Sequence, residues 1–312
     1  MMDATDRLSE EAEIPWKLRV EEPTNRFVYY PLARGLVRLL LHTPITANQV
    51  TLVQPVIAAI AAYLITLEDW RYMVMGALVF EFRSLLDCAD GTLARAKRTA
   101  SPNGHALDAI CDWASVVILY IGIYVHFVLH PPPPGEWNAY LPMGMVIGLS
   151  LVQGALRSFG HDYYMRKYGS IIETGRDETV EELRERQRAL THDSPFMARV
   201  EVFIGRCGHL FFQQEIFDVA RSRSISGEQA TLFSAQRHSP MVKLIQWLWS
   251  VSNGDAYIRL TIFSVLLGHA WMWELQLFWA TAGFAWIVSV LYLNAWFVRR
   301  ATEAVATVEL TA

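Results

Sequence analysis

Four long stretches without a charged side chain narrow the possible folds of this sequence. Residues 50–67, 113–129, 139–156 and 275–298 contain no Lys, Arg, Asp or Glu. A helix needs about 20 mostly apolar residues to cross the hydrocarbon core of a bilayer, and these windows approach or reach that length. Charged residues make up 19% of the chain, whereas roughly 25% is usual in soluble domains. We therefore expect helices that span a membrane.

Two further segments complete a set of six predicted spans. Residues 255–273 reach spanning length when their charged start is included, and a segment that begins at Tyr72 stays apolar as far as Phe80. Three of the loops between the spans together contain only one Lys or Arg residue, Arg71. Most other Lys and Arg residues lie in four segments, residues 1–48, 95–103, 160–256 and the C-terminal tail. Because positive residues are retained on the cytoplasmic side, we expect both termini in the cytoplasm.

The predicted fold class is an all-α integral membrane protein with six transmembrane helices, an N-terminal interfacial amphipathic helix and a cytoplasmic helical insert. The interfacial helix is expected at 26–42, where Arg34, Arg38 and His42 recur at every fourth position of a largely apolar segment. Helical spacing also predicts helices at 177–190 and 197–220 in the insert. The expected parts are the cytoplasmic N-terminus with the interfacial helix (1–48), transmembrane helices 1–4 (49–160), the insert (161–255), transmembrane helices 5–6 (256–300) and a cytoplasmic tail (301–312).

Acidic residues interrupt the apolar pattern between positions 87 and 112. Asp87 and Asp90 lie near the end of one predicted span, and Asp108 and Asp112 lie near the start of the next, each pair on one face of its helix. A turn signal at Pro102 separates the two helices, which makes them antiparallel neighbours. Each charge at mid-bilayer costs about 2.5–3.5 kcal/mol on insertion scales. The cluster therefore requires cationic partners.

The chemistry of this cluster favours hard divalent cations. Carboxylates without a Cys or His ligand pair suit Mg²⁺ or Mn²⁺. Two such ions would balance the four negative charges and leave coordination sites for phosphate oxygens, as in in-line phosphoryl displacement. Gly91 and Gly104 allow a ligand or the opposing backbone to come close, and Arg95 can donate a pair of hydrogen bonds to a phosphate. The residues alone indicate a two-metal phosphotransfer site at the cytoplasmic boundary of a membrane.

The same segment fits the pattern D-x2-D-G-x2-A-R-x8-G-x3-D-x3-D at every fixed position: Asp87, Asp90, Gly91, Ala94, Arg95, Gly104, Asp108 and Asp112. It resembles the signature of the CDP-alcohol phosphotransferase family, which are membrane enzymes of phospholipid synthesis. The resemblance covers about residues 40–160. There ITANQVTL precedes the first span much as the family's Pro-Asn-x-Val-Thr does, although Ala47 stands in place of the proline. The last two spans are similar in topology alone.

The resemblance implies roles for these residues. Asp87, Asp90 and Asp108 would hold two metal ions with help from Asp112, and Asp112 would act as general base on the acceptor hydroxyl. The nucleotide would be lined by motif residues and approached by a residue of the first span: Gly91, Ala94, Arg95, Gly104 and Asn48. Arg157, followed by Arg166 and Lys167, resembles the acceptor-phosphate arginine of phosphoglycerol-type members, although positive-inside placement explains Arg166 and Lys167 equally well. A homodimer is implied by resemblance only.

We expect the enzyme to transfer a phosphatidyl group from CDP-diacylglycerol to a polar alcohol, which can itself be phosphorylated, and to release CMP at the cytoplasmic face. The alternative within the family is a CDP-choline or CDP-ethanolamine enzyme that acts on a lipid alcohol. The alternative outside it is a cation or phosphate transporter. A purely structural role is also open, with the aspartates salt-bridged to Arg83, Arg95 or Arg157. The net charge of −4 argues against nucleic acid as a partner.

Overall fold

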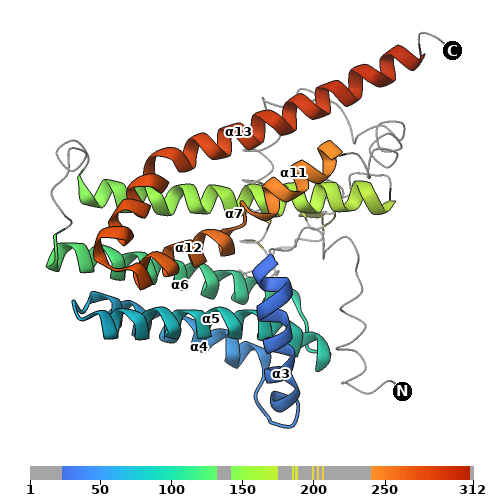
Figure 1. The fold of residues 1–312 in the computed structure, drawn as a ribbon. Coiled ribbons are helices and arrows are strands. Elements are labelled where there is room, and N and C mark those ends of the chain that lie inside the picture. The colour runs from blue at the N-terminus through green and yellow to red at the C-terminus, as the bar shows by residue number, and fades with distance from the viewer. Residues whose placement is uncertain are drawn as a thin grey trace. The chain divides into compact units, whose positions relative to one another are not determined.

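The computed structural model describes residues 23–131, 142–174 and 240–309, together with isolated residues between 185 and 206. Every element in the three continuous segments is helical (Figure 1), which confirms the expected all-α class. Apart from those isolated residues, the predicted insert helices at 177–190 and 197–220 lie outside the described residues. The elements are η2 (Asn25–Tyr29), α3 (Tyr30–Leu40), α4 (Ala47–Thr66), α5 (Trp70–Ala96), α6 (Pro102–Leu129), α7 (Met143–Thr174), α11 (Pro240–Ser250), α12 (Gly254–Leu267) and α13 (His269–Glu309).

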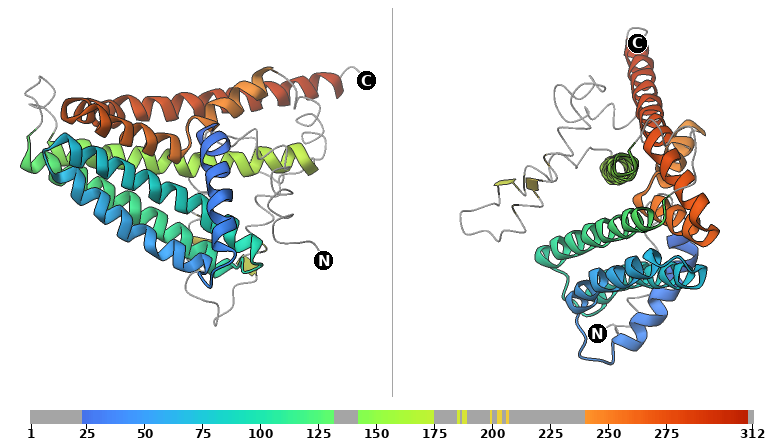
Figure 2. Two further views of the ribbon diagram at one scale, coloured as in Figure 1. Left: turned by 60° about the horizontal axis from the view of Figure 1, so that its bottom comes forward. Right: turned by 90° about the vertical axis from the view of Figure 1, so that its left-hand side faces the viewer.

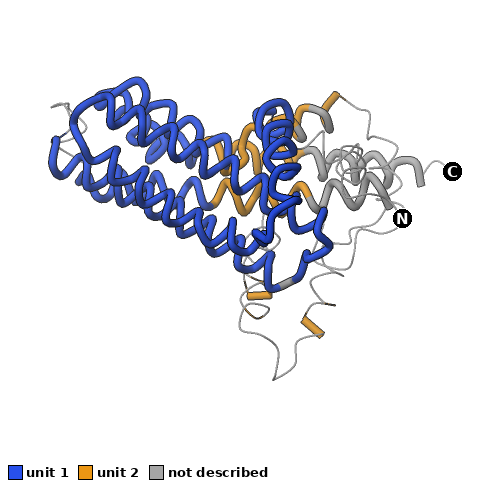
Figure 3. The backbone as a smooth tube through the Cα atoms, turned by 90° about the horizontal axis from the view of Figure 1, so that it is seen from below, with its two compact units in different colours: residues 1–14, 21–155, 255–284 blue, residues 15–20, 156–254, 285–312 orange. Residues whose placement is uncertain are grey.

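The chain divides into two compact units, each with its own core (Figure 3). The first unit consists of residues 1–14, 21–155 and 255–284, and the second consists of residues 15–20, 156–254 and 285–312. The core of the second unit gathers Tyr164, Ile245, Trp249 and Val290. There the rings of Tyr164 and Trp249 stack with their centroids 4.8 Å apart. All four motif aspartates belong to the first unit.

In the first unit, α4 packs along both α5 and α6. Small residues allow this close approach. A Cβ atom at Gly76 on α5 would lie 2.8 Å from the backbone oxygen of Ala61, and one at Gly122 on α6 would lie 2.7 Å from Cβ of Ala62. Contacts between small residues are typical of helices packed in membranes. Figure 2 shows α4, α5 and α6 side by side, with α3 crossing near one end of them.

Side-chain caps determine where α4 and α6 begin. The backbone N–H of Gln49 donates to Thr46 Oγ1 at 3.3 Å, and the backbone N–H of Thr46 donates to Gln49 Oε1 at 2.9 Å, which is a capping box. At the start of α6, the backbone N–H of Gly104 donates to Ser101 Oγ at 3.1 Å. These caps place the motif glycine in the first turn of α6, directly before the helical segment that holds Asp108 and Asp112.

Among the residues that the structure describes, three helical segments are long and apolar enough to cross a membrane: Ala47–Thr66, Asn103–Leu129 and His269–Trp296. This supports an integral membrane protein. The remaining spans and the orientation of the termini stay predictions. Charged residues along α5, such as Glu81 and Arg83, make this 27-residue helix less apolar than the three segments.

Several predicted boundaries differ from the structure. The fifth span was expected to continue through residues 255–273, but α12 ends at Leu267 and α13 begins at His269. Gly268, between them, has φ of +99°, a conformation that L side chains rarely adopt. The expectation of one unbroken segment was therefore wrong. Helix α7 also continues past residue 160 to Thr174, and α13 continues past residue 300 to Glu309.

Helices η2 and α3 occupy the segment where the interfacial helix was predicted. Ala33 and Val37 are buried, and they form a cluster with Ala89 and Leu93 of α5. Leu39, on another side of α3, is 70% exposed. One face of α3 is thus held by α5, and the proposed placement of the helix at a membrane surface stays a prediction.

Candidate active site

The two pairs of motif aspartates lie on neighbouring helices and are joined by an arginine. Asp87 and Asp90 are on α5, and Asp108 and Asp112 are on α6. Arg83 NH2 lies 3.3 Å from Asp87 Oδ1 and also donates a hydrogen bond to Asp112 Oδ1. The first and last aspartates of the motif therefore meet around one guanidinium group. This is the salt bridging by Arg83 that the structural alternative in the sequence analysis predicted.

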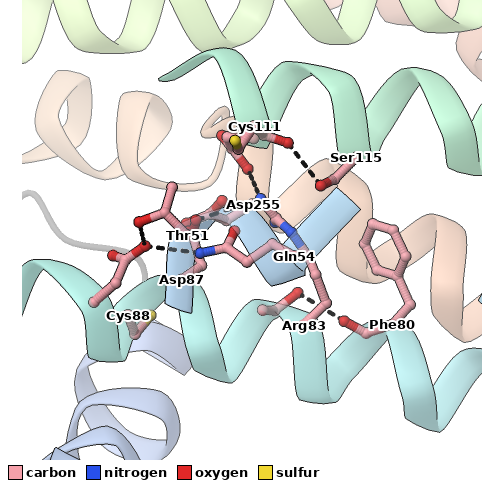
Figure 4. Close-up of polar contacts among 12 residues, drawn as sticks. Thr51, Gln54, Phe80, Arg83, Asp87, Cys88, Cys111, Ser115 and Asp255 are labelled. Carbon is pink, nitrogen blue, oxygen red and sulfur yellow. Dashed lines mark hydrogen bonds and ion pairs between the residues drawn. The ribbon is translucent and has the colours of Figure 1, made fainter. Parts of the chain in front are cut away.

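The second aspartate is held by the first long helix. Asp90 is buried, and its Oδ2 atom accepts hydrogen bonds from Thr51 Oγ1 at 2.6 Å and from Gln54 Nε2 at 2.8 Å. Thr51 and Gln54 are three positions apart on α4 and so lie on one face of the helix. Figure 4 shows both side chains directed at the polar cluster that also contains Arg83 and Asp87. Helix α4 is thus part of the site.

The sequence predictions assigned no site role to Thr51 or Gln54. Their polarity in an otherwise apolar helix was the available signal. A polar side chain buried in a membrane helix needs a hydrogen-bonding partner, and a pair at this spacing points to one partner. The sequence alone does not identify that partner as Asp90, because the partner lies on another helix.

A fifth carboxylate joins the cluster from α12. Asn25 Nδ2 donates to Asp255 Oδ2 at 2.7 Å, and Asp255 is close enough to Asp87 and Arg83 for their charges to interact. Arg259 donates to the side-chain oxygen of the same Asn25. Asp255 appears in the same close-up view as Asp87 (Figure 4). The acidic cluster therefore extends beyond the motif.

The short helix η2 is attached to both α5 and α12. The hydroxyl of Tyr29 donates to the carboxylate of Glu81 on α5, and the guanidinium carbon of Arg259 lies 4.4 Å from the centroid of the Tyr29 ring. Burial, together with the hydrogen bond to Glu81, raises the pKa of Tyr29, so the hydroxyl remains protonated and keeps its donor role. The segment before α3 thus borders the aspartate site.

Four of the residues predicted to line the nucleotide form two pairs, and the members of each pair lie close together. A Cβ atom at Gly104 would lie 3.4 Å from Asn48 Oδ1, which brings the start of α4 beside the start of α6. A Cβ atom at Gly91 would lie 3.3 Å from Arg95 NH1, so the arginine extends back along its own helix over the glycine. Ala94 is partly buried on the same helix. Nucleotide binding by these residues stays a prediction.

The three residues predicted to bind the acceptor belong to the second unit. Arg157 is buried, and its NH2 group donates to the backbone oxygen of Val251 at 2.9 Å. Arg166 and Lys167 lie on α7, and their side chains are outside the described part of the structure. Acceptor binding by any of the three stays a prediction.

The site offers carboxylate oxygens, the type of ligand atom that binds a hard divalent ion. The motif supplies four carboxylates, which Mg²⁺ and Mn²⁺ prefer, and a cationic group already lies between two of them. Within the described residues, no group of three or more His, Cys, Asp or Glu side chains converges closely enough to hold one ion. Arg83 occupies part of the space that such a ligand set would enclose.

Comparison with known proteins identifies one family and two relatives that match part of this chain. The ceramide phosphoethanolamine synthase family matches residues 12–147. A ceramide phosphoethanolamine synthase of Drosophila melanogaster is 28% identical over 130 residues, covering 38% of this chain and 33% of the relative. A bifunctional IPC transferase and DIPP synthase of Rubrobacter xylanophilus is 37% identical over 115 residues, covering 36% of this chain and 26% of the relative.

The chain thus spans about a third of the first relative and about a quarter of the second. The residues matched by the family contain the whole motif, from Asp87 to Asp112. Both relatives are named as enzymes, one as a synthase and the other as a transferase and synthase. The motif and the family match therefore lie on one stretch of sequence, in which this chain is similar to ceramide phosphoethanolamine synthases and resembles the CDP-alcohol phosphotransferase signature.

Proposed function

We propose that this chain is a membrane-embedded transferase that moves a phosphate-linked group from a CDP-linked donor to a hydroxyl group and releases CMP. The observation that carries the proposal is the meeting of Asp87 and Asp112 around one cationic group, beside the buried Asp90. Carboxylates gathered from two helices in this way supply the oxygen ligands that metal-assisted phosphoryl transfer uses. The intact motif supports the same reading.

Asp87, Asp90, Asp108 and Asp112 would hold two ions, Mg²⁺ or Mn²⁺. Such ions neutralise the charge of a diphosphate. Thr51 and Gln54 orient the Asp90 carboxylate, and Asn48 and Gly104 lie where the nucleotide is expected. Asp112, whose side chain is 42% exposed, would take the proton of the acceptor hydroxyl.

Two classes of donor remain, and the comparisons bear on the choice between them. The first is CDP-diacylglycerol with a polar alcohol as acceptor, for which the basic residues Arg157, Arg166 and Lys167 were proposed as ligands of a phosphorylated acceptor. The second is CDP-ethanolamine or CDP-choline with a lipid alcohol as acceptor. The matched family is named for ceramide phosphoethanolamine, a lipid that carries a phosphoethanolamine group. That name favours the second class for this chain.

The decisive experiment is an assay of CMP release with matched donor and acceptor pairs. The purified full chain in nanodiscs with Mn²⁺ receives CDP-ethanolamine or CDP-choline with ceramide or diacylglycerol, and separately CDP-diacylglycerol with a panel of polar alcohols. Mass spectrometry identifies the lipid product. Asp108→Asn serves as the inactive control and Arg71→Gln as the active one. Absence of CMP with every pair would contradict the proposal and would favour a cation or phosphate transporter.

We also propose that the enzyme is a homodimer with both termini and the active site at the cytoplasmic face. The concentration of Lys and Arg in the segments at 1–48, 95–103 and 160–256 supports the orientation. Single cysteines placed at residues 100 and 130 test it, because a membrane-impermeant thiol reagent added to intact cells is expected to label only position 130. Labelling at position 100 alone would reverse the orientation.

A further inference from the structure

Arg83 is buried behind carboxylates that are more exposed than it is. The side chain of Arg83 is 3% exposed, whereas those of Asp87 and Asp112 are 27% and 42% exposed. A single nitrogen, NH2, contacts the Oδ1 atom of both aspartates. One atom of α5 thus links the first motif aspartate on its own helix with the last one on α6.

This nitrogen occupies the place where a cation shared by the two aspartates would lie. Mg²⁺ requires its oxygen ligands at about 2.0–2.1 Å. A guanidinium nitrogen within hydrogen-bonding distance of both Oδ1 atoms blocks that approach by its volume and repels the ion by its charge. Arg83 in this position and a divalent ion bridging the same two oxygens therefore exclude one another.

The surroundings favour a cation here whenever metal ions are absent. Asp108 and Asp255 add negative charge around Asp87, and carboxylates that gather without a counter-charge are costly to bury. The Nε atom of Arg83 has no hydrogen-bonding partner among the described residues. Among the described residues, the guanidinium is therefore held by the hydrogen bonds of NH2 to the two aspartates and not by a hydrogen bond from Nε.

We infer that Arg83 is a built-in counter-ion of the aspartate site, which holds Asp87 and Asp112 together before divalent ions bind and weakens ion binding by competing for the same oxygens. This inference rests on the metal site of the proposed function. It assigns a role to a residue that lies outside the motif, one helical turn before Asp87.

Direct measurement of Mn²⁺ binding tests the competition. The metal-stripped full chain in detergent is titrated with Mn²⁺, and free Mn²⁺ is followed by electron paramagnetic resonance. Arg83→Gln is expected to bind Mn²⁺ about tenfold more tightly than the wild type, because a positive charge beside the ligands is gone. Arg83→Lys keeps the charge but loses the planar fork, so its affinity should lie between those two. Arg71→Gln, at the other end of α5, should match the wild type.

Thermal unfolding provides a second readout. Without metal, Arg83→Gln should unfold at a lower temperature than the wild type, and added Mn²⁺ should raise its midpoint by more than it raises that of the wild type, since a ligand stabilises in proportion to its affinity. If Arg83→Gln does not fold without metal, the comparison rests on Arg83→Lys, which must still bind Mn²⁺ more tightly than the wild type.

Unchanged or weaker Mn²⁺ binding in the Arg83 variants would overturn the inference, because a residue that merely supports the site would lower the affinity when it is lost. CMP release separates this result from failure of the proposed function. A wild-type chain that releases CMP while its Arg83 variants bind Mn²⁺ no more tightly refutes the counter-ion alone. A chain that releases no CMP while the variants bind Mn²⁺ more tightly refutes the transferase alone.

Discussion

Thr51 on α4 donates a hydrogen bond of 2.6 Å to Asp90 on α5, although 39 residues separate them along the chain. Gln54 donates a second bond to the same oxygen at 2.8 Å. Both donors are buried, so water does not compete with them. A carboxylate held by two donors has a defined orientation, which a metal ligand requires.

Thr51→Val should weaken the site, whereas Thr51→Ser should not. Valine has nearly the shape of threonine but no hydroxyl, and hydrogen bonds to charged groups contribute about 1.5–3 kcal/mol. We expect Thr51→Val to lower the free energy of unfolding by about this amount and CMP formation by about tenfold, because a misplaced ligand slows a positioned reaction. Serine retains the hydroxyl and should stay near the wild type. Equal behaviour of the two variants in both measurements would argue against a role for the hydrogen bond.

Asp112→Asn should separate binding from turnover. Asparagine keeps the size of the side chain but cannot accept the proton of the acceptor hydroxyl, and a general base contributes about 100-fold or more to the rate. We expect the variant to retain nucleotide binding in equilibrium dialysis while CMP formation falls by about that factor. Wild-type turnover in Asp112→Asn would show that another group takes the proton.

Removal of divalent ions should abolish the reaction reversibly. Chelation with EDTA is expected to stop CMP formation, and readdition of Mg²⁺ or Mn²⁺ should restore it, because carboxylate oxygens favour these hard cations. The lipid product and CMP should reappear together when both are followed by mass spectrometry. Full activity in EDTA after metal stripping would exclude the two-metal assignment of the aspartates.

Gly122→Ala should destabilise the bundle, with Gly148→Ala as the matched control. The added Cβ would lie 2.7 Å from Cβ of Ala62 in the first case, whereas nothing lies within 4 Å of it in the second. Overpacking costs about 1–3 kcal/mol, and both variants gain the same helix propensity. Thermal unfolding in detergent should therefore show a lower midpoint for Gly122→Ala than for Gly148→Ala. Equal midpoints would mean that α4 and α6 are free to separate slightly.

Much of the site could be predicted because its key residues are close together in the sequence. Asp87 to Asp112 lie on two helices joined by a short turn, so helical periodicity and a turn signal at Pro102 suffice to bring the two acidic faces together. The counter-charge from Arg83 was visible as an alternative, since it lies one turn before Asp87. The apolar window at 50–67 likewise predicted α4 with boundaries close to those observed, whereas the window at 113–129 predicted the end of α6 at Leu129 but not its start at Pro102.

The remaining features depend on contacts between distant segments. Asp255 reaches the cluster from α12, and its partner Asn25 precedes it by 230 residues, a pairing that periodicity does not encode. The orientation of Asp90 by Thr51 and Gln54 depends on how α4 is rotated against α5, where Gly76 lies against Ala61. The break at Gly268 was missed because apolar residues continue on both sides of it, and hydropathy does not register a backbone turn.

Helix α4 both packs against α5 and α6 and orients Asp90, which limits how the site can be transferred to another protein. Gly76 and Gly122 press their helices against α4 so closely that it has little room to rotate, and the same helix aims Asp90 through Thr51 and Gln54. Copying the eight signature positions onto another helical hairpin would reproduce the carboxylates. It would not reproduce the two hydrogen bonds from α4 that orient Asp90. The smallest transferable unit of the proposed site is therefore the three helices α4, α5 and α6, to which α12 adds Asp255.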